Sequence, residues 1–202
     1  SGGLLEGSIN ERNFLGKGID LNFTGRLASE KVSGVFSYID PNFMNSEKEL
    51  ANYFFSETDD YSNAGYKSKR IGDRLGTRYE IFEDIYLRPF GILQFDKLET
   101  NSNASSLLRT RDGNFTTTTL GFNLLADFRN SKNLPTSGSL SFFDQSYATL
   151  ISDVPTIQTS VGSTFYQELI NEKFIGSAKL KLSNVTAFDN KDIKLSDRLF
   201  AS

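Results

Sequence analysis

The 202-residue chain carries 22 Lys and Arg against 25 Asp and Glu, so its formal charge of −3 offers no general attraction for nucleic acid. It contains neither His nor Cys, which excludes imidazole-based acid–base chemistry, the usual catalytic triads, disulfides and cysteine metal sites. Hydrophobic residues make up 38% of the chain while aromatic residues reach 13%, and this combination fits a barrel in which alternate residues face lipid.

No apolar run approaches the roughly 18 to 20 residues that a membrane-spanning helix needs. Alternating strands give a much weaker hydropathy signal per segment than membrane helices do, so this absence says little against a membrane β-barrel. The chain begins with Ser1, and its one methionine, Met44, is internal. We expect the chain to be an interior piece of a longer protein.

Apolar and polar residues alternate along about ten segments, and this period of two indicates β-strands that each have one apolar face. In the second segment, for example, Leu21, Phe23 and Leu27 share one parity, whereas Asn22 and Arg26 share the other. In chain order, the predicted strands are Leu4–Asn13, Ile19–Leu27, Val32–Asp40, Glu47–Thr58, Tyr66–Phe82, Ile85–Leu98, Phe115–Phe128, Gly138–Tyr147, Ile157–Leu169 and Phe174–Phe188.

A helix competes with a strand only in the segment 66–82. Arg70, Arg74 and Arg78 are spaced as on a helix, but the glycines between them and their β-branched and aromatic neighbours favour a strand. On a strand the three arginines share one face, where we expect polar lumen packing beside acidic residues. Attraction of anions or partner loops is the alternative. Pro89, in the next strand, is tolerable at a sheet edge or a bulge.

The connections between these strands are predicted to alternate in length, as they do in outer-membrane barrels. Tight turns are expected near Gly16, Glu83 and Asn171. Longer polar loops are expected at 59–64, 101–112 and 151–155. No segment predicts a helix.

The connection at 127–138 is the most informative segment, because it lies between two clearly alternating strands. Pro135 fixes φ and Gly138 can adopt a positive φ, so the chain leaves one strand and enters the next in a defined way. Asp127 and Arg129 share a parity, which lets them pair with each other or with a neighbouring strand.

Several segments, in order, resemble the barrel of the outer-membrane-protein assembly factor BamA and its relatives, the bacterial surface antigen family. The resemblance covers nearly the whole chain, and 127–138 is its most specific segment. Residues 13–18, with Asn13, Leu15, Gly16 and Gly18, resemble the family's aromatic-Leu-Gly-x-Gly turn, and 37–43, with Pro41 and Phe43, resemble its strand ending in x-Pro-aromatic. The family's Asp-x-Arg and Pro-Thr-x-Gly turn is similar to the segment with Asp127, Arg129, Pro135, Thr136 and Gly138. The entry to its long extracellular loop resembles 195–202, with Asp197, Arg198 and Phe200.

The resemblance implies that POTRA repeats and the first barrel strand lie upstream and that the last strands lie downstream. It implies a non-enzymatic part of a machine that folds and inserts β-barrel proteins into the outer membrane, with no catalytic residue, cofactor or metal. The partners would be outer-membrane lipid and, through the full-length protein, client β-barrel proteins and assembly-complex lipoproteins. Five residues would act structurally, by fixing an inner-side turn: Asp127, Arg129, Pro135, Thr136 and Gly138.

We therefore predict that residues 1–202 are an all-β antiparallel meander of about ten strands. They would form part of a single outer-membrane β-barrel domain that is truncated at both ends. Two alternatives remain open. One is a passive porin or transporter barrel. The other is a soluble β-sandwich adhesion or binding module, in which the alternate apolar residues would be buried between two stacked sheets.

Overall fold

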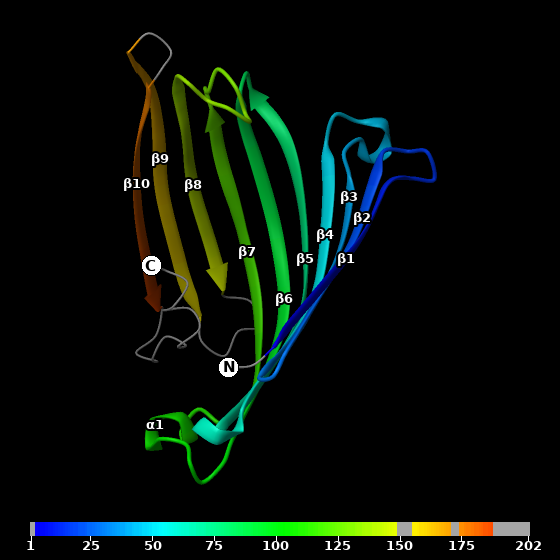
Figure 1. Cartoon of the computed structure of the whole chain (residues 1–202), viewed down its shortest axis with the longest axis vertical. Helices are drawn as coiled ribbons and strands as arrows, with labels where there is room; N and C mark the ends of the chain where they lie inside the picture. The colour runs from blue at the N-terminus through cyan, green and yellow to red at the C-terminus, as the bar shows by residue number, and fades with distance from the viewer. Residues whose placement is uncertain (1–2, 149–154, 171–173, 188–202) are drawn as a thin grey trace. The chain divides into compact units, whose positions relative to one another are not determined.

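The computed structural model describes residues 3–148, 155–170 and 174–187. Ten strands form one sheet whose order follows the sequence from β1 to β10, so the predicted antiparallel meander is confirmed (Figure 1). The strands are β1 Leu4–Phe14, β2 Ile19–Ala28, β3 Lys31–Asp40, β4 Glu49–Tyr61, β5 Tyr66–Phe82, β6 Ile85–Thr100, β7 Gly113–Asp127, β8 Gly138–Ala148, β9 Thr156–Ile170 and β10 Phe174–Ala187.

The strands divide into two compact units. The N-terminal unit contains β1 to β4 together with residues 66–77 of β5, 91–100 of β6 and 113–119 of β7. The C-terminal unit contains the other ends of those three strands, together with β8, β9 and β10. The long strands β5, β6 and β7 thus contribute to both units.

Residues 66–82 form the strand β5, as the glycines predicted. Gly72 is buried, and a Cβ atom placed on it would come within 2.5 Å of the Phe55 ring and 2.9 Å of the Leu93 carbonyl oxygen. The Phe55 ring therefore lies against the backbone of Gly72, and a side chain at residue 72 would displace the ring. The same arrangement recurs in the C-terminal unit, where Phe90 covers Gly121 and Phe142 covers Gly162.

The prediction of a loop at 59–64 is wrong in its first half. Asp59 to Tyr61 continue β4, and Asp59 pairs with Lys31 across the ladder. The Lys31 ammonium lies 2.8 Å from a Glu57 carboxylate oxygen and 3.5 Å from an Asp59 oxygen. These cross-strand charge pairs favour a strand at residues whose polarity alone indicates a loop.

The prediction that no segment is helical is also wrong, although the helices are single turns in connections. They are η1 Phe43–Asn45, η2 Ser62–Ala64 and α1 Ser106–Arg109. Ser105 caps α1 by accepting a hydrogen bond from the Leu108 N–H, and a cap of this kind leaves no trace in the alternation of apolar and polar residues. None of the helices in the described part of the chain is long and apolar enough to cross a membrane.

Pro89 lies in β6, which has β5 and β7 as neighbours, so of the two positions expected to tolerate it the edge strand is excluded and a bulge stays a prediction. The tight turns expected near Gly16 and Glu83 and the long loop expected at 101–112 are present. The expected alternation in length is wrong, because the short turn 83–84 and the long connection 128–137 lie at the same end of the C-terminal unit, where the Asp127 N–H donates to the Asp84 carbonyl. The predicted turn at 171–172 and most of the loop at 151–155 fall outside the described residues.

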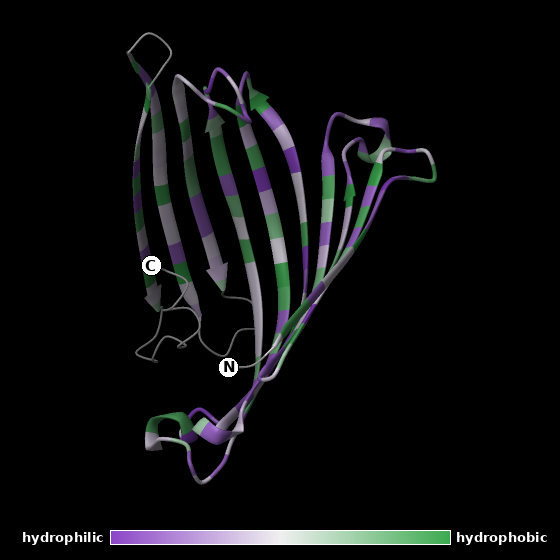
Figure 2. Ribbon diagram, viewed as in Figure 1, coloured by the Kyte–Doolittle hydropathy of each residue, from purple (hydrophilic) through white to green (hydrophobic). Residues whose placement is uncertain are grey.

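One face of the sheet is apolar in each unit, and Figure 2 shows the alternation along the strands. In the N-terminal unit, Phe23, Phe36 and Phe54 are directly opposite one another on β2, β3 and β4, and all three are exposed. In the C-terminal unit, the Phe122 and Phe143 rings lie 6.0 Å apart, and Leu120 and Val161 are exposed.

The opposite face of the N-terminal unit carries ion pairs between Arg26 and Glu6 and between Arg70 and Asp96. Across all described residues only three hydrophobic side chains are buried, Ile19, Ala104 and Ala148, and no large side chain is fully buried. A two-layer core is therefore absent from this part of the chain, and the β-sandwich alternative is wrong.

Candidate functional site at the connection between β7 and β8

The connection that follows β7 is organised around an ion pair whose carboxylate is buried. Asp127, the last residue of β7, is only 7% exposed. The Arg129 guanidinium donates from Nε to Asp127 Oδ1 at 2.7 Å and from Nη2 to Oδ2 at 2.8 Å, which is the bidentate geometry of a strong charge-assisted pair. This pairing, to which the nearby Tyr166 hydroxyl adds, raises the pKa of Arg129 above its ordinary value. Of the two options that parity left open for Asp127 and Arg129, the structure shows pairing with each other.

A second set of hydrogen bonds closes the connection around Asn130. Its side-chain amide donates to the Thr136 hydroxyl at 2.7 Å, and its carbonyl oxygen accepts from the Thr136 and Ser137 N–H groups at 3.0 and 3.1 Å. Pro135, which is half-buried, precedes these two residues and has no N–H of its own to satisfy. One asparagine thereby holds the two arms of the connection together.

Gly138 begins β8 with a φ of 99°, a left-handed conformation that side-chain-bearing residues rarely adopt. A Cβ atom at this position would overlap the Phe128 carbonyl oxygen and would lie 2.9 Å from Arg129 Cα. The Phe128 N–H donates to the Ser139 carbonyl at 2.8 Å, so the two strands are already paired beside the glycine. Only glycine allows this close approach.

The connection is also attached to the turn between β5 and β6. The Asp127 N–H donates to the carbonyl of Asp84, a turn residue whose φ is 59°. In addition, Lys132 Nζ lies 5.7 Å from the centre of the Tyr86 ring. The Arg78 guanidinium lies 5.6 Å from the same ring. Both distances are within the range of cation–π attraction, so the Tyr86 ring on β6 contacts one cation from β5 and one from the connection 128–137.

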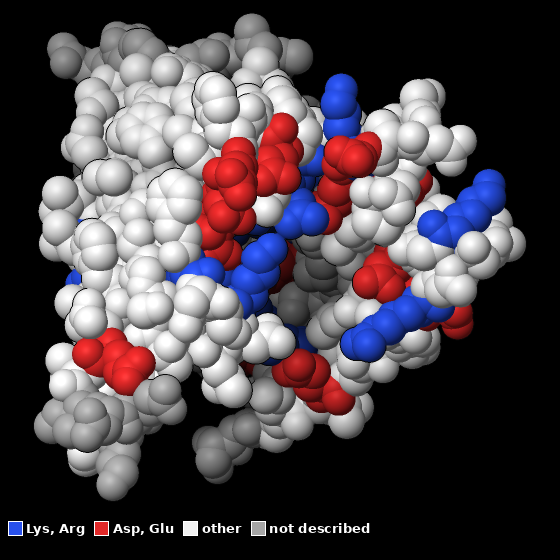
Figure 3. All heavy atoms as spheres, turned by 90° about the horizontal axis from the view of Figure 1, so that it is seen from above, with Lys and Arg blue, Asp and Glu red and all other residues white. Residues whose placement is uncertain are grey.

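The structure thus gathers Asp127, Arg129, Thr136 and Gly138, with Pro135 between them, into one connection of the C-terminal unit. The predicted basic residues have separate surroundings. Arg70 pairs with Asp96 at 3.0 Å, which agrees with polar packing beside an acid, whereas Arg78 contacts Tyr86. Asn52 donates to the backbone carbonyl of Arg74 at 3.4 Å. Figure 3 shows that basic and acidic side chains lie beside each other in mixed clusters, with wide areas that have neither.

The predicted glycine-rich turn lies in the N-terminal unit. Asn13, Leu15, Gly16 and Gly18 all have positive φ, and the Gly18 N–H donates to Asn13 Oδ1 at 2.7 Å. A Cβ atom on Gly18 would lie 4.0 Å from Pro41, so this turn is next to the connection after β3. In that connection the Phe43 N–H donates to the Lys48 carbonyl at 3.0 Å. The predicted loop-entry residues Asp197, Arg198 and Phe200 lie outside the described residues.

The sequence interpretation missed a polar pair on an apolar face. The Asn52 amide donates to both carboxylate oxygens of Asp73, at 2.9 and 3.1 Å. Asn52 has the parity of Phe54 on β4, and Asp73 has the parity of the exposed Leu75 on β5, so the pair lies among exposed apolar side chains. On β5 a signal was available, because Asp73 interrupts the apolar parity of Ile71 and Leu75. On β4 the sequence favoured the parity of Tyr53 and Phe55 as the apolar one, and the exposed Phe54 shows that Asn52 is on the apolar face.

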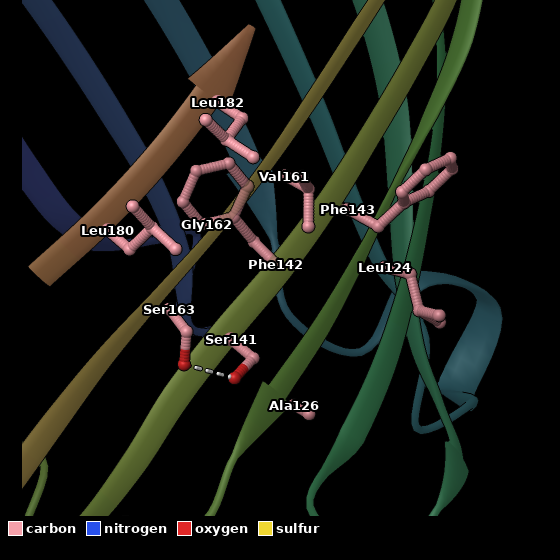
Figure 4. A pocket seen from close by; sticks show the side chains of 10 residues that line it. All are labelled: Leu124, Ala126, Ser141, Phe142, Phe143, Val161, Gly162, Ser163, Leu180 and Leu182. Atoms are coloured by element: carbon pink, nitrogen blue, oxygen red, sulfur yellow. Dashed lines mark hydrogen bonds between the residues drawn. The ribbon is translucent and has the colours of Figure 1, made fainter.

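The apolar face of the C-terminal unit has a shallow hollow of about 330 Å³ (Figure 4). The hydroxyls of Ser141 and Ser163 share a hydrogen bond of 2.7 Å within it, so they satisfy each other. The other residues of the lining are apolar or glycine: Leu124, Ala126, Phe142, Phe143, Val161, Gly162, Leu180 and Leu182. The hollow therefore suits hydrocarbon better than a polar ligand.

Comparisons with known proteins agree with this architecture. The chain is similar in structure to "The crystal structure of BamA from Haemophilus ducreyi lacking POTRA domains 1-3", with a TM-score of 0.79 and 21% sequence identity. The similarity covers 96% of this chain but 40% of that one, and at this identity it establishes the fold alone. No curated protein matches the chain by sequence. The model of the Omp85 superfamily domain matches residues 13–202, and the chain therefore belongs to the Omp85 superfamily.

Proposed function

We propose that this chain is a wall segment of the transmembrane β-barrel of an outer-membrane protein assembly factor, which folds β-barrel proteins and inserts them into the outer membrane. Residues 1–202 would be part of one barrel domain whose other strands lie outside the chain. The activity is non-enzymatic and uses no cofactor. The observation that carries the proposal is a single sheet with an exposed apolar face in a chain of the Omp85 superfamily.

The apolar face supports an outer-membrane location for physical reasons. A single sheet with one exposed apolar face is unstable in water, whereas hydrocarbon solvates that face and the strands satisfy the backbone hydrogen bonds. All ten described strands also reach or exceed the roughly nine to eleven residues of a tilted membrane-spanning strand. Outer-membrane lipid is then the direct partner of this segment. Client barrels and assembly lipoproteins are partners of the full-length protein.

Within this proposal, the connection between β7 and β8 has a structural role. Five residues hold an inner-side turn in one conformation and attach it to the β5–β6 turn: Asp127, Arg129, Pro135, Thr136 and Gly138. The ion pair and the Asn130 bonds support this role, because they fix the backbone at the point where two long strands reverse. Loss of this turn would misalign the wall and would not remove a reacting group.

The test is to reconstitute the full-length protein that contains this segment into phospholipid vesicles and add a urea-unfolded outer-membrane barrel as client. We expect the client to fold faster than in empty vesicles, as measured by its heat-modifiable gel mobility. Vesicles with an unrelated porin are the control. Flux of small solutes with no acceleration of client folding would instead identify a passive porin and would contradict the proposal.

A further inference from the structure

Two neighbouring connections of the N-terminal unit expose a large apolar side chain at the same end of β1 to β4 (Figure 1). Leu15, between β1 and β2, is 74% exposed, and Met44, between β3 and β4, is 83% exposed. The connections are adjacent, because a Cβ atom on Gly18 would lie 4.0 Å from the Pro41 ring. The two side chains thus lie in adjacent connections at one end of the strands.

The backbone at both residues is unusual for the residue types present. Leu15 has a φ of 56° and Met44 a φ of 55°, in the left-handed region that favours glycine or asparagine. Glycine would relieve this strain, yet each position has a bulky apolar residue. Backbone strain that the surrounding structure maintains is a reason to seek a function.

Hydrogen bonds hold both residues in this conformation. Around Leu15, the Gly16 N–H donates to the Asn13 carbonyl at 2.9 Å, and the Gly18 N–H donates to the Asn13 side chain. Around Met44, both the N–H and the hydroxyl of Ser46 donate to the Phe43 carbonyl, at 3.1 and 2.6 Å. The exposure of the two side chains is therefore a property of ordered turns.

We propose that Leu15 and Met44 insert together into the boundary between the headgroups and acyl chains of a phospholipid bilayer. This inference rests on the proposed function, because the bilayer is the one that the apolar face would contact. Leu15 and Met44 lie in the connections that join β1 to β2 and β3 to β4, and β2, β3 and β4 carry the exposed Phe23, Phe36 and Phe54 of the apolar face. Lys17 is in the same turn as Leu15 and is also exposed, so it provides a polar position beside the apolar one.

The chain contains no cysteine, which permits a site-specific test in the full-length protein once any cysteine outside this segment has been replaced. An environment-sensitive fluorophore is attached to Leu15→Cys or Met44→Cys in vesicles that contain lipids brominated either near the carbonyl or in mid-chain. Lys17→Cys is the matched control in the same turn, and Phe36→Cys tests the apolar face. Retained heat-modifiable mobility verifies that each variant is folded.

At positions 15 and 44 we expect quenching by the shallow bromine to exceed that at position 17 by about twofold, with protection from aqueous iodide. If iodide quenches positions 15 and 44 as strongly as position 17, while mid-chain bromine quenches position 36, the inference is wrong and the proposed function stands. Protection of positions 15 and 44 from both quenchers would mean that a protein covers them, which also overturns it. If bromine does not quench position 36 either, the proposed function itself fails.

Discussion

At the scale of single residues, Gly138 is the position where the structure is least tolerant of change. Its left-handed φ and the nearby Phe128 carbonyl both exclude a Cβ atom. We expect Gly138→Ala to destabilise the full-length protein by roughly 3 kcal/mol, measured by urea unfolding in vesicles. Gly7→Ala is the control, because nothing lies within 4 Å of a Cβ atom there and its φ is not in the left-handed range. Equal effects of the two substitutions would contradict this interpretation of the turn.

Arg129 is the second residue with a sharp expectation, because its partner Asp127 is buried. Arg129→Leu leaves that carboxylate without its bidentate donor, so we expect a loss of about 3 kcal/mol in the free energy of unfolding. Arg129→Lys keeps the charge but not the two parallel hydrogen bonds, and it should lose less. Urea unfolding monitored by gel mobility provides the comparison, and a lysine variant as unstable as the leucine variant would show that charge contributes little.

At the scale of elements, the pair formed by Asn52 and Asp73 joins β4 to β5 on an apolar face. Asn52→Leu leaves the Asp73 carboxyl without its amide donor among apolar side chains, and we expect a cost of about 1 to 3 kcal/mol. The double variant Asn52→Leu with Asp73→Leu should recover most of this loss, because neither polar group then remains. A double-mutant cycle of unfolding free energies measures the coupling, and additive losses would show that the two residues act independently.

The loop between β6 and β7 provides a test by pH, since it lies outside the strands. Asp112 accepts hydrogen bonds from the Thr100 hydroxyl at 2.7 Å and from the Thr100 N–H at 3.1 Å, and these bonds lower its pKa below the ordinary value. A carboxyl whose pKa is lower in the folded state contributes stability above its unfolded pKa and loses it as the pH falls through the folded pKa.

Thr100→Val removes the hydroxyl donor and keeps the N–H. We therefore expect the pKa of Asp112 to rise toward its ordinary value, so that the carboxyl protonates at higher pH than in the unsubstituted protein. Carboxyl carbon chemical shifts in an NMR titration measure this change. Thr117→Val, on β7, serves as a substitution of the same kind away from the carboxyl. An unchanged Asp112 titration in the Thr100 variant would mean that the N–H alone sets the pKa.

At the scale of the whole molecule, the decisive property is which face of the sheet meets hydrocarbon. Val35 and Phe36 are neighbours on β3 with nearly equal exposure, 40% and 41%, but they point to opposite faces. We expect a nitroxide on Phe36→Cys to be accessible to oxygen and one on Val35→Cys to a water-soluble nickel complex, as measured by power-saturation electron paramagnetic resonance in vesicles. Equal accessibility of the two labels would contradict a lipid-facing side.

The local pattern of residues was sufficient to predict the ten strands and the choice of strand over helix for β5, because alternation with a period of two is local. The same local pattern indicated a loop at Asp59 and gave no sign of α1. At Asp59 the favourable charge is on Lys31, which is on another strand, and α1 depends on a cap at Ser105 rather than on hydrophobic periodicity. Whether the connection 127–138 has the role that we propose for it stays a prediction.

The amino-acid sequence by itself determined the class of this protein: strands with one apolar face, no helix core and no imidazole or thiol chemistry. It also determined the family, through short turn motifs that lie within single connections. Only the tertiary structure decided that Arg129 pairs with Asp127, that Asp84 and Tyr86 hold the same connection, and that Asn52 bonds Asp73 on the apolar face. The physical reason is that alternation is a property of one strand, whereas these contacts depend on the register between strands and on backbone torsions in turns.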